Sequence, residues 1–238
     1  MFILTLYEHY KFNFCFFLFC FSLHSQEGFN DLKEYGLRGR VKSFESTYYS
    51  TKEIQEMWII DTLKSKSKVD FDENGNITKI VNLSFSESEL KIETIEFQRD
   101  KNERKISYKK YNEYEVFETG TYKWIDERKY QINSIDSFGI RTESEFTLTK
   151  NLRDKSGTTA YFDSKSGEYL LTYKYENILD EYGNLLRSKI TYEPIDKSSI
   201  MIYDVQELDS MGNWIKINLY YEDEDFRQIM IRKIEYYN

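Results

Sequence analysis

Three five-residue stretches decide the fold: Asp72-Glu-Asn-Gly-Asn76, Asp180-Glu-Tyr-Gly-Asn184 and Asp209-Ser-Met-Gly-Asn213. Each has the composition of a tight turn between two strands. The aspartate at the first position can accept hydrogen bonds from backbone N–H groups two residues further on. The glycine adopts the positive φ that such a turn requires without a Cβ clash. These residues are therefore predicted to be structural, in three copies of one β-hairpin turn.

The turn signal recurs at a nearly constant interval. Weaker copies occur at Asp136 with Gly139, at Asp154 with Gly157, and at Asp100, where Asn102 is interpreted as replacing the glycine. One series of aspartates has steps of 28, 26, 28, 26 and 29 residues: Asp72, Asp100, Asp126, Asp154, Asp180 and Asp209. Two strands and two turns fill such an interval. The sequence thus predicts a chain of repeated hairpins.

The segments between the turns are rich in aromatic and β-branched residues, which favour strands. Residues 92–97 alternate partly between apolar and polar, as a strand does when one face is packed and the other is wet. A helical period is suggested only over residues 27–35. We therefore expect an all-β fold: an antiparallel meander of about a dozen strands, forming a curled or twisted sheet. Its last strand, residues 228–237, would be an unpaired edge open to strand addition.

The first 25 residues have the anatomy of a cleavable secretory signal. An apolar run over residues 12–23 is too short to span a bilayer as a helix, follows Lys11, and is followed by His24-Ser25-Gln26. We expect a signal peptide over residues 1–25, a single β-rich domain over residues 26–238, and no membrane span in the mature chain. The mature protein would be periplasmic, outer-membrane-associated or secreted.

Removal of this leader would also remove every cysteine and histidine, namely Cys15, Cys20, His9 and His24. The mature chain could then form no Ser-His-Asp triad, thiol nucleophile, imidazole zinc site or disulfide. Carboxylates would remain, and two carboxylates suffice for glycoside cleavage. Glu143 and Glu145 are the best candidate pair, because residues two apart on a strand share a face.

The net charge and the acidic clusters of the chain limit the partners that it can bind. A net charge of −8 and a pI near 5.1 argue against binding to nucleic acid, which needs clustered lysine and arginine. The densest acidic run, Glu222, Asp223, Glu224 and Asp225, is a weak candidate for Ca²⁺, since oxygen ligands bind this ion. The run lacks the alternating ligand spacing of a calcium loop, so a hydrated hairpin tip is the favoured interpretation. No other metal site or cofactor is predicted.

Residues 71–79, 180–187 and 209–216, which contain the three turns, resemble the YD (RHS-type) repeats of bacterial exported and surface proteins. The stretch Gly36-Leu-Arg-Gly-Arg-Val-Lys-Ser43 is similar to the start of many uncharacterised exported proteins from Bacteroidetes-type bacteria. The resemblance implies β-hairpin architecture, a location in or outside the cell envelope, and binding or scaffolding roles that include carbohydrate contact. It transfers no catalytic residue, because the matching positions are turn residues.

The sequence therefore favours an exported, non-catalytic binding or scaffold protein of the bacterial cell envelope, with a glycan or an envelope protein as its partner. Two alternatives stay open. One is a carboxylate-dependent enzyme acting on a glycan, and the other is a purely structural subunit of an envelope assembly.

Overall fold

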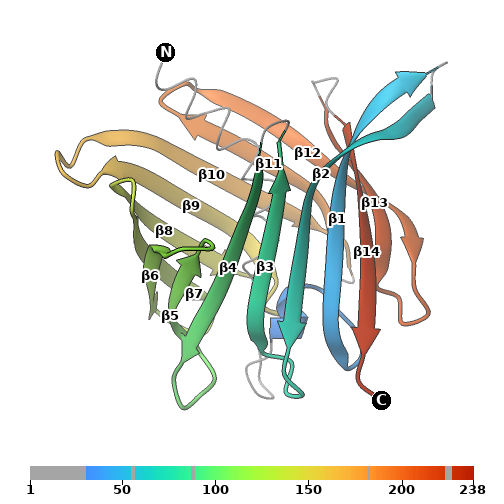
Figure 1. Ribbon diagram of the computed structural model, residues 1–238, viewed down its shortest axis with the longest axis horizontal. Helices are drawn as coiled ribbons and strands as arrows, with labels where there is room; N and C mark the ends of the chain where they lie inside the picture. The colour runs from blue at the N-terminus through green and yellow to red at the C-terminus, as the bar shows by residue number, and fades with distance from the viewer. Residues whose placement is uncertain (1–30, 55–56, 87–88, 182, 223–226) are drawn as a thin grey trace.

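The computed structural model describes residues 31–54, 57–86, 89–181, 183–222 and 227–238, which form one short helix and a closed barrel of fourteen strands (Figure 1). The elements in chain order are α2 (Asp31–Glu34), β1 (Val41–Ile54), β2 (Met57–Phe71), β3 (Ile77–Phe85), β4 (Leu90–Arg99), β5 (Lys105–Tyr111), β6 (Val116–Trp124), β7 (Lys129–Asp136), β8 (Ile140–Leu148), β9 (Asp154–Asp163), β10 (Tyr169–Leu179), β11 (Leu185–Glu193), β12 (Lys197–Leu208), β13 (Trp214–Tyr221) and β14 (Arg227–Tyr236).

Each strand pairs with its neighbours in the sequence, and β14 pairs with β1 to close the wall. Phe44 in β1 is opposite Val69 on one side and Ile234 on the other. The prediction of an all-β antiparallel meander was right, whereas the prediction of a curled or twisted sheet with an unpaired last strand was wrong. Closure pairs the backbone N–H and C=O groups of both edge strands at once. The prediction missed it because the turn residues carry no signal for the register between β1 and β14.

Side chains alternate between the two faces of the wall. In β10 the inward-facing Leu171, Tyr173 and Tyr175 are buried, while Lys174 and Glu176 between and beside them are exposed. The same period of two places tyrosine, isoleucine and leucine side chains of nearly every strand in one internal hydrophobic core. The interior of this barrel is therefore its apolar side.

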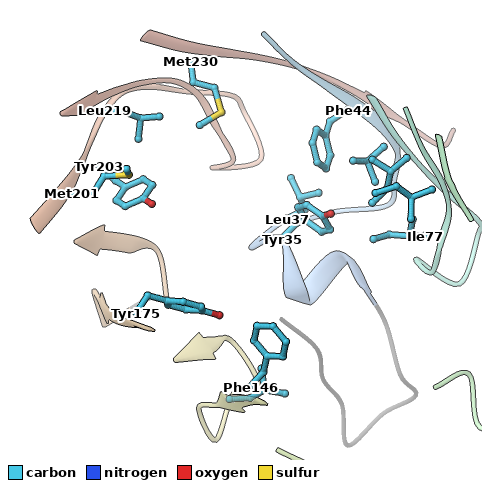
Figure 2. Packing of buried hydrophobic residues seen from close by; sticks show 14 of the residues in the cluster. Tyr35, Leu37, Phe44, Ile77, Phe146, Tyr175, Met201, Tyr203, Leu219 and Met230 are labelled. Atoms are coloured by element: carbon cyan, nitrogen blue, oxygen red, sulfur yellow. The ribbon is translucent and has the colours of Figure 1, made fainter. Parts of the chain in front are cut away.

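Residues 31–40, which we call the plug, begin with α2 at one end of the barrel. Tyr35 and Leu37 of the plug point into the interior (Figure 2), whereas residues 38–40 are exposed. The Tyr35 ring packs at 5.2 Å from the Phe44 ring and at 6.0 Å from the Phe71 ring, measured between centroids. Leu32 and Leu37 are also buried in the core. A helix of four residues has little stability of its own. Its position is therefore determined by these contacts with the wall.

The Asp-x-x-Gly-Asn stretches form turns between β2 and β3, β10 and β11, and β12 and β13, which all lie at the plug end. At the first of them, the Asp72 Oδ1 atom accepts hydrogen bonds from the Asn74 and Asn76 amides, each 2.9 Å long. Gly75 has a φ of 81°, in the left-handed region that favours glycine. Gly183 and Gly212 have φ values of 84° and 78° in the sister turns.

In the third copy of the motif, the final asparagine connects the turn to the plug. The Asn213 side chain accepts a 2.7 Å hydrogen bond from the Arg38 amide and donates a 3.0 Å bond to the Arg38 carbonyl. Asn213 also donates to the Tyr236 hydroxyl at 2.7 Å. At the first turn, the Gly75 carbonyl accepts a 3.0 Å hydrogen bond from the Leu32 amide. The repeated turns therefore hold the plug as well as reversing the chain.

The predictions for two of the weaker turn copies were wrong. Asp154 begins β9 and Gly157 lies within that strand, while the turn itself spans residues 149–153. Gly157 is required because the Tyr175 and Phe146 rings pack against its backbone. In the copy at Asp100, the glycine position belongs to Glu103, with a φ of 63°, and not to Asn102. Asp126, by contrast, accepts a hydrogen bond from the Arg128 amide within a turn at the plug end.

Gly157→Ala is expected to lower the free energy of unfolding by about 1–3 kcal/mol, the usual cost of overpacking a core. A Cβ atom at this position would lie 2.5 Å from a Tyr175 ring carbon and 2.8 Å from a Phe146 ring carbon. Urea denaturation measures the change. Ser156→Ala, on the outer face of the same strand, is the control and should change stability by less than about 0.5 kcal/mol. Equal effects of the two substitutions would contradict the packing role of Gly157.

Candidate binding site between the plug and the wall

A cavity of about 80 Å³ lies between the plug and strands β9 to β13. Its lining includes three aromatic side chains and three polar ones: Tyr35, Tyr203, Trp214, Arg153, Asp154 and Asn177. Figure 2 shows Tyr203 and Tyr175 extending from the wall toward the plug. A larger hollow of about 360 Å³ lies beside the turns at residues 125–129 and 149–153. Its charged lining residues Asp126, Arg128, Lys150 and Lys155 are solvent-exposed, whereas most of the residues that line the smaller cavity are buried or half-buried, so the smaller cavity is the better candidate for a binding site.

Asp154 is the carboxyl group in the lining of this cavity. Its Oδ2 atom accepts a 2.6 Å hydrogen bond from the Tyr175 hydroxyl and a 3.1 Å bond from the Asn177 amide. Its Oδ1 atom is buried and has no partner. Burial raises the pKa of Asp154 to about 8, because an ionised carboxylate loses its hydration there. At neutral pH the cavity lining therefore contains a mainly neutral carboxyl group, one oxygen of which is buried without a hydrogen-bond partner.

Arg153 crosses from the wall to the plug. Its Nη1 atom donates a hydrogen bond to the Lys33 carbonyl, and its side chain passes between Gly36 of the plug and Gly183 of the turn after β10. A Cβ atom at Gly36 would lie 3.0 Å from Nη1, so this close approach requires glycine. Burial and the nearby charge of Arg38 lower the pKa of Arg153 to about 10. The guanidinium is still charged at neutral pH.

A second guanidinium lies against the aromatic part of the site. Arg232 points inward from β14 and is 3% exposed. Its guanidinium carbon is 3.3 Å from the Trp214 ring centroid and 4.6 Å from the Phe44 ring centroid. Within the described ranges no ion pair joins Arg232 to a carboxylate, and its Nη1 atom has no hydrogen-bond partner. Burial lowers its pKa to about 9, so this inward charge also persists at neutral pH.

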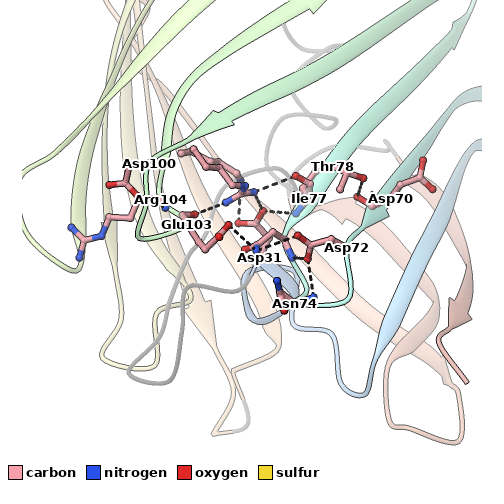
Figure 3. A network of polar contacts seen from close by, with 12 residues as sticks. Asp31, Asp70, Asp72, Asn74, Ile77, Thr78, Asp100, Glu103 and Arg104 are labelled. Carbon is pink, nitrogen blue, oxygen red and sulfur yellow. Dashed lines mark hydrogen bonds and ion pairs between the residues drawn. The ribbon is translucent and has the colours of Figure 1, made fainter.

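A buried ionic cluster at Asp31 fixes the plug on the opposite side of the barrel (Figure 3). Asp31 is 0% exposed, and its Oδ2 atom accepts a 2.7 Å hydrogen bond from the Ile77 amide and a further bond from Arg99. The Lys105 Nζ atom, on a side chain that is also 0% exposed, lies 3.4 Å from Asp31 Oδ1. Asp31 thus connects the first residue of α2 to β3, β4 and β5.

The structure brings some of the predicted residues to this site and places others elsewhere. Gly183 and Asn184 of the second repeated turn line the cavity. Glu143 and Glu145, the candidate catalytic pair, lie on the outer face of β8, where Arg141 and Lys129 pair with them. They face no cavity of the described structure. The turn residues of the other two copies hold the plug, as described above.

The remaining predictions fall largely on residues that the structure does not describe. The signal peptide over residues 1–25 and the acidic residues Asp223, Glu224 and Asp225 are outside the described ranges. Glu222 is exposed at the end of β13. Among the described residues, no group of three or more histidine, cysteine, aspartate or glutamate side chains is placed to hold a metal ion.

The outer face of the wall carries paired charges. Ion pairs join Lys174 to Glu193 at 2.6 Å, Lys129 to Glu145 at 2.7 Å, and Lys216 to Glu207 at 3.3 Å. A barrel wall in contact with lipid has apolar side chains at outward positions, where lysine is destabilising. These charged positions are therefore suited to water. Separately, no described helix is long and apolar enough to cross a membrane.

Comparison with known proteins gives no family. No protein-family model matches the chain, and no curated protein matches it. Among solved structures, the chain is similar to a porin-like protein from Bacteroides vulgatus, with a TM-score of 0.49 and 10% identity over 83% of this chain and 99% of that one. It is also similar to a porin-like protein from Bacteroides uniformis, with a TM-score of 0.48 and 10% identity over 82% of this chain and 98% of that one. These likenesses carry no functional assignment.

Proposed function

We propose that this chain is an exported, non-catalytic binding protein of the cell envelope that holds the end of a glycan between its plug and its wall. The observation that carries the proposal is the cavity beside the plug, which is lined by the buried Asp154 carboxyl group together with aromatic rings. Aromatic walls with a few placed polar groups are the usual composition of a site for a small ligand. Sugars suit such a site, because their C–H faces pack on rings and their hydroxyls pair with carboxyl, amide and guanidinium groups.

The rest of the barrel supports binding rather than conduction. The plug fills one end of the interior with buried side chains, and the outer face carries paired charges suited to water. A water-exposed barrel in the periplasm or outside the cell agrees with a cleavable leader. We also retain a relationship to YD (RHS-type) hairpin repeats as a proposal, supported by the three repeated turns that lie together at the plug end.

A cavity-filling substitution tests this proposal. Val205 lines the cavity and is 38% exposed, so Val205→Phe should fill the space without removing a polar group. Val116→Phe is the matched control, because Val116 is 41% exposed at the start of β6 and does not line the cavity. The chain from Gln26 would be screened on a glycan array, and hits would be measured by isothermal titration calorimetry.

We expect at least one glycan to bind the unsubstituted chain and the Val116→Phe variant, with a loss of about tenfold or more in affinity for Val205→Phe. Melting curves of both variants show whether the barrel is intact. If no glycan binds, or if a glycan binds Val205→Phe with unchanged affinity, the proposed site is wrong. Affinity capture from the cell envelope would then test the alternative of a protein partner.

A further inference from the structure

We propose that the cavity accepts an anionic group of its ligand, namely the carboxylate of an acidic sugar at the end of the glycan. This inference rests on the proposed function, and it defines the chemical class of the ligand. Three features of the described site lead to it: its positive charges, the state of its carboxyl group, and its volume.

Positive charge gathers around this cavity. The Arg153 guanidinium forms part of the lining, and Arg38 of the plug is close enough to Arg153 to lower its pKa. Arg232 stacks on Trp214, which forms another part of the lining. A guanidinium matches the planar geometry of a carboxylate and binds it through two parallel hydrogen bonds. The two inward arginines therefore favour a negative group in this space over a positive one.

The carboxyl group in the lining does not neutralise this charge. Asp154 is mainly protonated at neutral pH, since burial raises its pKa to about 8. A protonated carboxyl donates one hydrogen bond. With Oδ2 already bonded to Tyr175 and Asn177, a proton on the unpartnered Oδ1 can be donated to an oxygen of the ligand. Asp154 thus acts toward an anion as a donor instead of repelling it.

An arginine without a counter-ion is a costly feature of a protein interior. Removing a guanidinium from water carries a large desolvation penalty that a partner charge normally offsets. For Arg232, the described residues offer the Trp214 and Phe44 rings and a 3.4 Å contact with the Ser46 hydroxyl. The charge of Asp209 acts on Arg232 and opposes the lowering of its pKa, but the two side chains form no ion pair. Stacking on the two rings offsets part of the desolvation penalty of the guanidinium. A ligand carboxylate near Trp214 would offset more of this penalty.

The volume limits how much of the ligand can enter. A cavity needs about 10–15 Å³ to hold one water molecule, and this cavity measures about 80 Å³. This space is large enough for a carboxylate group together with part of the sugar that carries it. The remainder of the ligand would stay at the mouth, beside Gly183 and Asn184.

Two matched oligosaccharides and two small anions test the inference on the chain from Gln26. The oligosaccharides are an oligogalacturonide and a neutral galactose oligomer of the same length, and the small anions are acetate and phosphate. Each is titrated into the unsubstituted chain, Arg153→Gln and Arg232→Gln, with Arg227→Gln as the control on the outer face of β14. Binding is measured by calorimetry and by tryptophan fluorescence, because Trp214 forms part of the cavity lining and stacks on Arg232.

We expect the acidic oligomer to bind about tenfold or more tightly than the neutral one, and each inward substitution to remove about tenfold of that affinity. Arg227→Gln should leave the affinity for both oligomers unchanged, although it removes a contact with the Trp58 ring and can shift the baseline fluorescence. Arg232→Gln keeps the inference testable if Arg153→Gln unfolds the plug.

Equal binding of both oligomers, unaffected by either inward substitution, overturns the inference and leaves the proposed function intact. Binding of acetate or phosphate that depends on Arg153, without binding of any glycan, supports the anion site and overturns the proposed function. Failure of every anion to bind overturns the anion site.

Discussion

Asp31→Asn is expected to lower the free energy of unfolding by about 3–5 kcal/mol, the usual cost of removing one partner from a buried ion pair. The Asp31 carboxylate faces two cations, Arg99 and Lys105, and the Lys105 side chain is 0% exposed. An asparagine has the same shape and keeps an oxygen for the Ile77 amide, but it carries no charge. Both cations would then remain buried without their counter-ion, and the plug would lose its ionic connection to β4 and β5.

Urea denaturation followed by tryptophan fluorescence measures this loss. Asp70→Asn is the control, because Asp70 pairs with Lys68 at 3.0 Å on the partly exposed outer face. An exposed pair of this kind contributes about 0–1 kcal/mol. A loss below about 1 kcal/mol for Asp31→Asn would show that the cluster does not fix the plug. Because the plug forms one side of the cavity through Tyr35, ligand binding should weaken in the same variant.

Strand content and hairpin order could be read from the sequence, because they depend on local signals. Asp72 and Gly75 mark a turn through their own backbone chemistry, whatever surrounds them. Closure depends on the pairing of Ser43 with Glu235 and of Tyr48 with Met230, residues about 190 positions apart in the chain. No local pattern defines that register, so an open sheet was the natural expectation and was wrong.

The site could be predicted less well than the fold, because the same residue pattern has different causes in different places. Asp154 and Gly157 have the spacing of a turn, yet packing of Tyr175 and Phe146 places them in a strand. Arg232 follows the apolar residues Ile229, Met230 and Ile231, and the sequence does not indicate which of these neighbours faces inward. The sequence did contain one signal of the contact between the turns and the plug, namely the asparagine after each repeated glycine. A turn does not need this asparagine, and in the third copy the Asn213 side chain holds the plug by hydrogen bonds to Arg38.

The largest effect of pH on stability is expected from Asp154. Its pKa is about 8 in the folded protein, against the ordinary value of 3.8 for an aspartate in the unfolded chain. Below pH 3.8 the carboxyl is protonated in both states and contributes no difference. Between pH 3.8 and 8 the unfolded chain binds fewer protons than the folded one, so stability falls as the pH rises, by about 1.4 kcal/mol per pH unit. Above pH 8 the carboxyl is ionised in both states, so the contribution of Asp154 to the free energy of unfolding no longer changes with pH.

Asp154→Asn removes this titration while preserving the shape of the side chain and an oxygen that can accept from Tyr175 and Asn177. The variant and the unsubstituted chain should have similar stabilities near pH 4, and the variant should become progressively more stable than the unsubstituted chain as the pH rises to 8. Urea denaturation at pH intervals between 4 and 9 gives the difference in free energy of unfolding between the variant and the unsubstituted chain, in which the contributions of the other titrating groups cancel.

Asp163→Asn is the control. Hydrogen bonds from Ser166 lower the pKa of Asp163, so the contribution of Asp163 to stability is lost only at acidic pH, and the fall in stability between pH 5 and 8 should persist in this variant. A difference curve that stays flat for Asp154→Asn would mean that the cavity holds an ionised carboxylate. Such a result would favour a cationic group in the cavity and would count against the anionic ligand as well.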